Sequence, residues 1–263
     1  MAGLVMRLIM ALVVAVSSLI SYCGSRQYNP VTGEEQYISL TARQEVSLGM
    51  SAVDEMMARH GGLLPADRDQ ERVDAVGQRI VRRSAAGESS WPFEFHLLAD
   101  TRTVNAFALP GGQIFITAGL YQKLSGDAPL AAILAHEIAH VVARHSSEHI
   151  AKARLTRRLT DAVVVASGDA TAGRISAVVG ALVNMKFSRD DEVEADRLGV
   201  FFMADAGYRP DGMIEVMEIL AGLGAGGRMP DFFSTHPSPD NRIGKISVAI
   251  RDWEAQKAGG KAD

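Results

Sequence analysis

The sequence predicts an α+β fold that is mostly helical and carries a small β-sheet. Apolar residues recur at helical spacing along most of the chain, whereas the stretches 91–99 and 105–117 alternate and contain Pro110, Gly111 and Gly112. With 263 residues, of which 47% are hydrophobic and 22% are charged, the chain can bury a large core. The formal net charge of -4 argues against a nucleic-acid partner, and the single cysteine excludes an intrachain disulfide.

The N-terminal residues 1–23 have the pattern of a signal peptide. Arg7 precedes the apolar run 8–20, which is too short for a comfortable transmembrane helix and suits the apolar region of a signal peptide. The run leads to Cys23, where a bacterial lipoprotein would be cleaved and acylated, although Tyr22 departs from the small residue usual before that cysteine. The sequence therefore predicts membrane attachment through lipid on Cys23, with an uncleaved N-terminal anchor as the alternative.

One folded domain is predicted over residues 40–254. Residues 24–39 are rich in polar and turn-forming residues and predict a tether, and the tail 255–263 is predicted to be disordered. The first helix of the domain has Thr41 as its expected N-cap. Helical spacing predicts helices over 41–60, 66–86, 127–159, 176–185, 190–206 and 210–222.

The apolar run 130–145 carries three ionisable residues in its middle, His136, Glu137 and His140. They form the H-E-x-x-H pattern of zinc peptidases. On a helix the two histidines point within ~40° of each other and lie about one turn apart, so both can reach one metal ion. Glu137 lies beside them, where a carboxylate can take a proton from metal-bound water. A buried helix without a metal would leave these three groups without a compensating partner.

A catalytic zinc site usually has three protein ligands, so a further ligand is needed. His145 is one residue out of place and is expected to be capped or to face solvent, and Glu148 lies about 12 Å further along the same helix. Downstream, Glu192 and Asp196 share one helix face, and Glu194 projects from another. Because both faces carry apolar residues further on, the spacing alone leaves Glu192 and Glu194 as alternatives.

HEIAH followed about fifty residues later by SRDDEVEAD resembles the HtpX-like and CAAX-prenyl-protease-like family of zinc metallopeptidases, which combine HExxH with ExxxD. CGSRQYNPVTGEEQYISL is similar to the lipoprotein start of the family's exported bacterial branch, and VNAFALPGGQIFITAGL and STHPSPDNRI extend the resemblance. The resemblance implies a zincin-like domain with one Zn2+ per chain. It also implies that Glu192 is the third ligand and that Asp196 supports a zinc-binding histidine.

Two further groups of residues have expected roles in catalysis. His236, in THPSP, and Arg242 are candidates for donating to the oxyanion that develops on the attacked carbonyl. His236 has a second expected role, because its imidazole could occupy the fourth zinc position at rest and swing away when substrate enters. Residues 105–108 (Asn105, Ala106, Phe107 and Ala108) are expected to offer a strand edge to which an extended peptide adds.

These patterns predict a zinc endopeptidase that acts on unfolded or misassembled proteins, with an exported location on the periplasmic side of a bacterial envelope as an outer-membrane lipoprotein. Quality control of envelope proteins is what the resemblance implies. The first alternative is a chaperone or assembly factor that binds unfolded chains in the same cleft. The second is a latent peptidase, with access blocked by His236 or by the glycine-containing segment 167–180.

Overall fold

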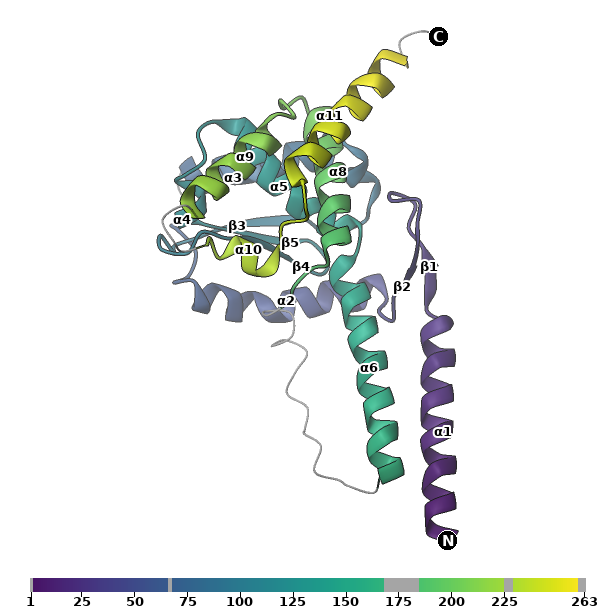
Figure 1. The fold of residues 1–263 in the computed structure, drawn as a ribbon. Coiled ribbons are helices and arrows are strands. Elements are labelled where there is room, and N and C mark those ends of the chain that lie inside the picture. The colour runs from purple at the N-terminus through teal and green to yellow at the C-terminus, as the bar shows by residue number, and fades with distance from the viewer. Residues whose placement is uncertain (1, 66–67, 168–184, 225–228, 260–263) are drawn as a thin grey trace.

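A three-stranded sheet lies inside the domain, with helices packed on both of its faces, in the computed structural model, which describes residues 2–65, 68–167, 185–224 and 229–259 (Figure 1). The central strand β5 (Gln113–Thr117) pairs in parallel with β3 (Glu94–Leu98) and antiparallel with β4 (Ala106–Leu109). The order β3-β5-β4 leaves β4 at the edge of this sheet. The two alternating stretches of the sequence therefore form strands as predicted.

Helices make up most of the remaining structure, which confirms the mostly helical α+β class. They are α1 (Ala2–Cys23), α2 (Ala42–Arg59), α3 (Arg68–Arg83), the 3-10 helix η1 (Ala85–Glu88), α4 (Ala118–Tyr121), α5 (Asp127–Val142), α6 (His145–Ser167), α8 (Arg189–Asp205), α9 (Gly212–Gly224), α10 (Phe232–Thr235) and α11 (Arg242–Gly259). The side chain of Thr41 caps α2 as expected. Helix α11 continues to Gly259, so the first part of the predicted disordered tail is helical.

Helix α5 lies at the centre of the domain. Every residue from Pro129 to Val142 is buried, and α5 contacts α3, α8, α9 and the sheet. Burial on all sides explains why the sequence 130–142 is apolar around the whole helix rather than along one stripe. The ionisable residues of HEIAH are therefore held in the core of the protein.

The helix predicted over 127–159 is two helices, and the break follows the HEIAH motif closely. Arg144 has a left-handed backbone, with φ of 56°, and α6 begins at the next residue. Side-chain amides of Asn29 and Gln36 donate to the carbonyl oxygens of Val142 (2.8 Å) and Ala143 (2.5 Å). A continuing helix would need those carbonyls for its own hydrogen bonds, so these side chains end α5.

The predicted tether contains the residues that end α5. Strands β1 (Arg26–Tyr28) and β2 (Glu35–Tyr37) form an antiparallel hairpin. Asn29, Gln36 and Ile38 are buried against the domain. This part of the segment 24–39 is thus packed structure rather than a free tether, because its polar side chains satisfy backbone groups of the core.

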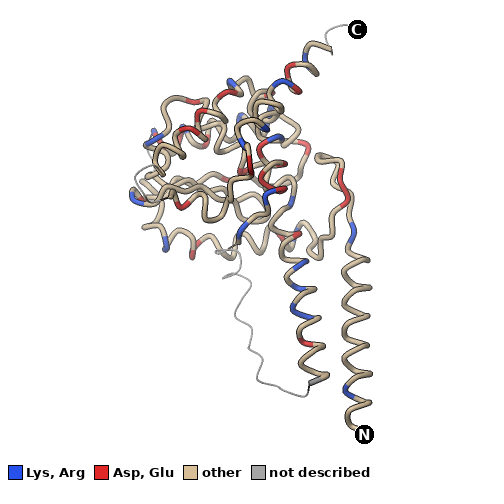
Figure 2. The backbone as a smooth tube through the Cα atoms, in the orientation of Figure 1, with Lys and Arg blue, Asp and Glu red and all other residues tan. Residues whose placement is uncertain are grey.

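Helix α1 lies beside α6 and projects with it from the domain (Figure 1). By length and composition α1 is long and apolar enough to cross a membrane, a test that an N-terminal signal sequence also passes. The cations of α6 that the sequence places at 152–158 are exposed along the helix (Figure 2). The predicted helix 176–185 and the segment 167–180 lie almost entirely outside the described residues.

Candidate metal centre

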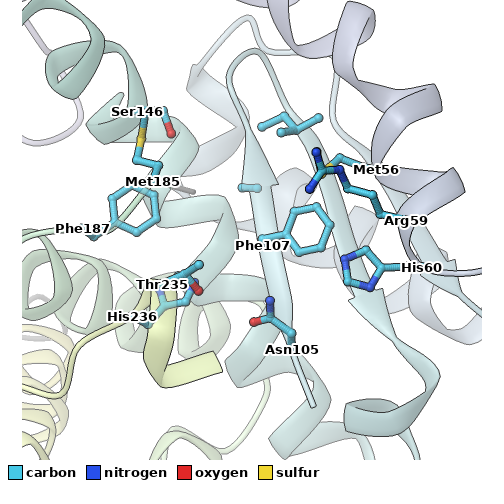
Figure 3. Close-up of a pocket in the computed structure, with 12 residues that line it drawn as sticks. Met56, Arg59, His60, Asn105, Phe107, Ser146, Met185, Phe187, Thr235 and His236 are labelled. Atoms are coloured by element: carbon cyan, nitrogen blue, oxygen red, sulfur yellow. The ribbon is translucent and has the colours of Figure 1, made fainter. Parts of the chain in front are cut away.

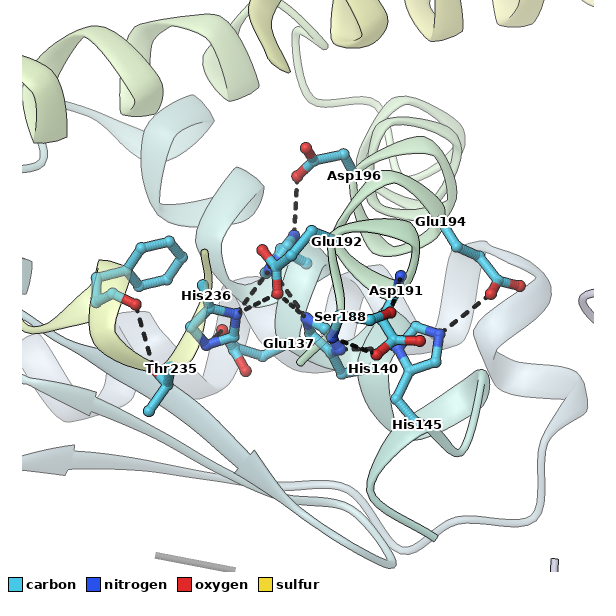
Figure 4. A network of polar contacts seen from close by, with 12 residues as sticks. Glu137, His140, His145, Ser188, Asp191, Glu192, Glu194, Asp196, Thr235 and His236 are labelled. Carbon is cyan, nitrogen blue, oxygen red and sulfur yellow. Dashed lines mark hydrogen bonds and ion pairs between the residues drawn. The ribbon is translucent and has the colours of Figure 1, made fainter. Parts of the chain in front are cut away.

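Three separated parts of the chain meet in one buried cluster (Figure 4). Helix α5 supplies His136 and His140, the first turn of α8 supplies Glu192, and His236 follows α10. Ser188 and Asp191 form a capping box that fixes the start of α8, which explains how Glu192 is directed at α5. One ligand atom from each of the four clustered residues lies within 4.8 Å of the other three.

The distances within this cluster match a four-coordinate metal. Nε2 of His136 lies 3.1 Å from Nε2 of His140 and 3.3 Å from Nδ1 of His236. Oε1 of Glu192 lies 3.4 Å from Nε2 of His140 and 3.0 Å from Nδ1 of His236. Four ligands that surround one zinc ion tetrahedrally lie about 3.3 Å apart. Three imidazoles and a carboxylate are also a donor set that suits zinc, so the residues fit the ion that the sequence predicts.

Glu137 lies next to the cluster and is fully buried. Both of its carboxylate oxygens lack a hydrogen-bond partner among the described residues, and Nε2 of His236 is 3.5 Å from Oε1. Burial raises the pKa of the Glu137 carboxyl above its ordinary value. A buried carboxylate without a partner is costly unless a charged or polar group completes its surroundings. Glu137 can therefore exchange a proton with a group bound at this cluster.

The protonation of the cluster depends on its burial and on its carboxylates. Burial lowers the pKa of His140 well below its ordinary value, which favours the neutral imidazole that metals bind. Burial also acts to lower the pKa of His236, but the nearby carboxylates of Glu137 and Glu192 outweigh it and raise this pKa above the ordinary value. His236 can thus serve as a cationic donor, or lose its proton and become a ligand.

Asp196 and Arg242 lie behind the cluster. Oδ1 of Asp196 is 3.0 Å from Nδ1 of His136. The Arg242 guanidinium donates to both oxygens of Asp196, at 2.7 and 2.8 Å, and its Nη2 is 3.1 Å from Oε2 of Glu192. The position of Asp196 agrees with its expected role as the support of a metal-binding histidine. Arg242 pairs with the two carboxylates, and its Nη1 is buried without a partner among the described residues.

His145 and Glu194 form a second contact chain, which the sequence analysis missed. Nδ1 of His145 lies 2.8 Å from Nδ1 of His140, and Nε2 of His145 lies 3.1 Å from Oε2 of Glu194. His145 is only 1% exposed, so the expectation that it is capped or faces solvent is wrong. The break after α5 turns it toward His140. The alternatives Glu192 and Glu194 also separate, because Glu192 lies in the cluster and Glu194 lies outside it (Figure 4).

A cavity of about 350 Å³ opens beside the cluster and runs along the edge strand β4 (Figure 3). Phe187 stacks on His140 with ring centroids 3.9 Å apart, and both Phe187 and His236 line the cavity. Asn105 is buried at the cavity, and its Oδ1 has no partner among the described residues. Further lining residues come from segments that the sequence analysis did not connect with the site: Met56, Arg59, His60, Ser146, Met185 and Thr235.

One buried turn carries two histidines and a glutamate, and a second glutamate from another helix completes the ligand set. This is the arrangement of a metal-dependent peptidase. The sequence profile of peptidase family M48 matches residues 67–250, and this chain belongs to that family. The mitochondrial metalloendopeptidase OMA1 of Schizosaccharomyces pombe is 34% identical over 88% of this chain and 68% of its own length. The protein is therefore a metalloendopeptidase.

Two bacterial relatives are similar over a comparable part of the chain. The putative beta-barrel assembly-enhancing protease of Vibrio cholerae is 29% identical over 83% of this chain. The beta-barrel assembly-enhancing protease of Escherichia coli K12 is 27% identical over 85%. This chain spans about half the length of these two relatives, 46% and 47% respectively. The similarity thus covers only part of these longer proteins.

Proposed function

We propose that this protein is a zinc-dependent endopeptidase whose metal is held by His136, His140 and Glu192 and whose general base is Glu137. One observation carries the proposal: both oxygens of Glu137 are buried without a hydrogen bond among the described residues, next to a cluster with the spacing of a tetrahedral zinc site, and Nε2 of His236 lies 3.5 Å from Oε1. A structural carboxylate at that depth would be hydrogen-bonded. A catalytic base needs its oxygens free for the attacking water.

Zinc, when bound, supplies a Lewis acid and lowers the pKa of a bound water toward ~7. Glu137 accepts a proton from the attacking water and passes it to the leaving amine. Its burial beside the cluster suits both steps, because no other side chain holds its oxygens by a hydrogen bond among the described residues. His236 supplies a donor to the oxyanion through Nε2, whereas Arg242, the other expected donor, lies behind the cluster and acts through its ion pairs with Asp196 and Glu192.

A latent state is a second candidate, and the position of His236 favours it. Nδ1 of His236 lies 3.3 Å from Nε2 of His136 and 3.0 Å from Oε1 of Glu192. These distances are similar to those of Nε2 of His140 from the same two atoms, 3.1 and 3.4 Å. An imidazole in that position would take the place of the attacking water. In this proposal the peptidase is inactive until His236 leaves the cluster.

We propose that substrate binds in the cavity along β4. This strand is the edge of its sheet, so an extended peptide can add to residues 105–108 by backbone hydrogen bonds. Asn105 offers a buried Oδ1 acceptor, and Met56, Phe107 and Phe187 offer apolar surface. Recognition through backbone hydrogen bonds and apolar contacts favours unfolded chains, because their backbone groups and apolar side chains are accessible. The same surface would serve the alternative role of a chaperone or assembly factor.

The cellular setting is proposed from the N-terminus and from the bacterial relatives. The names of those relatives connect them with β-barrel assembly, and α1 ends at the exposed Cys23. These observations support a cell-envelope protein on the periplasmic side, attached to a membrane by lipid on Cys23 or by a retained α1. They also support the exported lipoprotein branch of the HtpX-like family that the sequence resembles.

The test is the cleavage of casein, an unfolded protein, by the detergent-solubilised full chain, its Glu137→Gln variant and its His236→Ala variant, each with its zinc content measured. We expect Glu137→Gln to hold one zinc and to lose activity by about 10³-fold or more, since the base is essential. A rise in the activity of His236→Ala would support the latent state. Equal cleavage by the wild type and Glu137→Gln would disprove the assignment of the base.

A further inference from the structure

We propose that His145 and Glu194 are positioning residues that fix the tautomer and orientation of His140 for metal binding. The inference rests on the proposed metal site and assigns a role to two residues outside it. His140 contacts His145, and His145 contacts Glu194, at 2.8 and 3.1 Å. Neither residue touches the position that the four ligand atoms surround.

The proton assignment follows from the contacts alone. Nε2 of His140 faces the cluster, 3.1 Å from Nε2 of His136, so it must keep its lone pair to bind a metal. The proton of neutral His140 is then on Nδ1 and is donated to Nδ1 of His145. Since Nδ1 of His145 accepts, its own proton is on Nε2, where it is donated to Glu194. This arrangement satisfies every contact with both rings neutral.

Burial makes the assignment stable. His145 is 1% exposed and His140 is 2% exposed, so water does not compete for the bond between them. The Glu194 side chain is 24% exposed and accepts at the outer end of the chain of contacts. A His140 ring that flipped or exchanged its tautomer would leave Nδ1 of His145 without a donor in a dry site, which is costly.

The fold positions His145 by an unusual backbone conformation. Residues five apart on a continuous helix lie ~140° apart around its axis, so an unbroken helix would direct His145 away from the metal side of His140. The left-handed φ of Arg144 redirects the chain at this point. The Arg144 guanidinium is held by Glu45, which is 1% exposed, and by Oε1 of Gln27 at 2.8 Å. A residue with a left-handed backbone, held in place by the buried Glu45, suits a functional site.

A second histidine on α6 provides a matched control. Nε2 of His149 lies 2.7 Å from Oδ2 of Asp191, so this pair also joins α6 to α8. It contacts none of the four clustered residues through a hydrogen bond among the described residues. Removal of His149 therefore reproduces the loss of an α6–α8 contact without the loss of support for His140.

The experiment measures the zinc Kd of the full chain in detergent by competition with a chromophoric chelator. Loss of an outer partner of a metal ligand weakens metal binding roughly 10–100-fold, which we expect for His145→Leu. His145→Asn should recover part of this loss, because the Asn oxygen lies near the position of Nδ1 and can accept from His140. Glu194→Gln should weaken binding less than His145→Leu, and His149→Leu, which removes a contact of the α8 capping box rather than of a ligand, should weaken it far less than His145→Leu.

Melting of the metal-free variants serves as the second measurement. Similar melting of His145→Leu and His149→Leu, together with zinc binding that is weakened far more in His145→Leu, would establish the positioning role. Equal effects of the two variants on zinc Kd would reduce His145 to a packing residue and overturn the inference. No zinc binding by the wild type would disprove the proposed function as well, whereas normal binding by both variants would disprove the inference alone.

Discussion

The two histidines of HEIAH are supported in different ways. His136 reaches a carboxylate directly, through the 3.0 Å contact of its Nδ1 with Asp196. Nδ1 of His140 reaches one only through His145, and that carboxylate, Glu194, is partly exposed. Asp196 in turn is locked to the buried Arg242. The first support is therefore short, charged and enclosed, and the second is longer and ends at the surface.

The difference shows how each histidine is connected to the rest of the fold. The support of His136 connects the metal-binding cluster to α11 through Arg242. The support of His140 connects it to α6, and through the break at Arg144 to the N-terminal hairpin. A perturbation of α11 should thus act on His136, and a perturbation of the hairpin should act on His140.

The largest expected effect comes from Asp196→Ala. Arg242 is 4% exposed and would lose its bidentate partner, which for a buried ion pair costs about 3–5 kcal/mol of unfolding free energy. The measurement is urea unfolding of the metal-free protein. The double variant Asp196→Ala, Arg242→Met should recover part of that loss, because the unpaired guanidinium is removed, and the remaining loss reflects the ion pair of Arg242 with Glu192. If the double variant is as unstable as the single one, the unpaired charge of Arg242 is not the cause of the lost stability.

A smaller loss of unfolding free energy is expected from substitutions in the hairpin. Asn29→Ala or Gln36→Ala leaves a carbonyl at the end of α5 without its partner, which costs about 1–3 kcal/mol when the group is buried. Zinc binding should weaken as well, since the same carbonyls define the break that directs His145 at His140. The exposed Glu34 offers a control on the same hairpin. Glu34→Ala should change neither the free energy of unfolding nor the zinc affinity. Unaltered zinc affinity in both amide variants would separate the hairpin from the metal site.

The smallest expected effect is the pH dependence of the contribution that Asp191 makes to the free energy of unfolding. Burial acts to raise the pKa of Asp191, but hydrogen bonds from His149 and Ser188 hold this pKa well below its ordinary value. Stability from Asp191 is therefore fully present above the ordinary carboxyl pKa of ~4 and is lost as pH falls below it. Asp191→Asn should cost about 1 kcal/mol at pH 7, where the residue also takes part in the capping box. The difference from wild type should shrink on acidification, as urea unfolding between pH 7 and pH 3 would measure.

Spacing in the sequence was sufficient to bring His136 and His140 together, whereas the choice of Glu192 over Glu194 needed the resemblance to a known family. HEIAH places His136 and His140 on one side of a helix, and the i, i+4 spacing of Glu192 and Asp196 places both toward that helix, as the structure has them. Local rules also predicted the capped start of α2 and the strands of the sheet. In each case the information lies within a few residues of the feature itself.

The break after α5 could not be predicted in this way. Arg144 is not a glycine, and nothing in its neighbours demands a left-handed backbone. The cause lies more than 100 residues earlier, in Asn29 and Gln36, which bond to the end of α5 only when the chain is folded. The role of His145 depends on that break and was missed for the same reason. Tertiary contacts, rather than local propensity, decided where the metal helix ends.

The position of the hairpin also gives the N-terminus a mechanical connection to the catalytic centre. The hairpin follows α1 directly, and its two amides bond to residues two and three positions beyond His140. A force along α1 therefore acts on these two hydrogen bonds before it reaches the sheet or α11. A displacement of α1 therefore reaches the end of α5 through the hairpin, on the side of His140 rather than on that of His136.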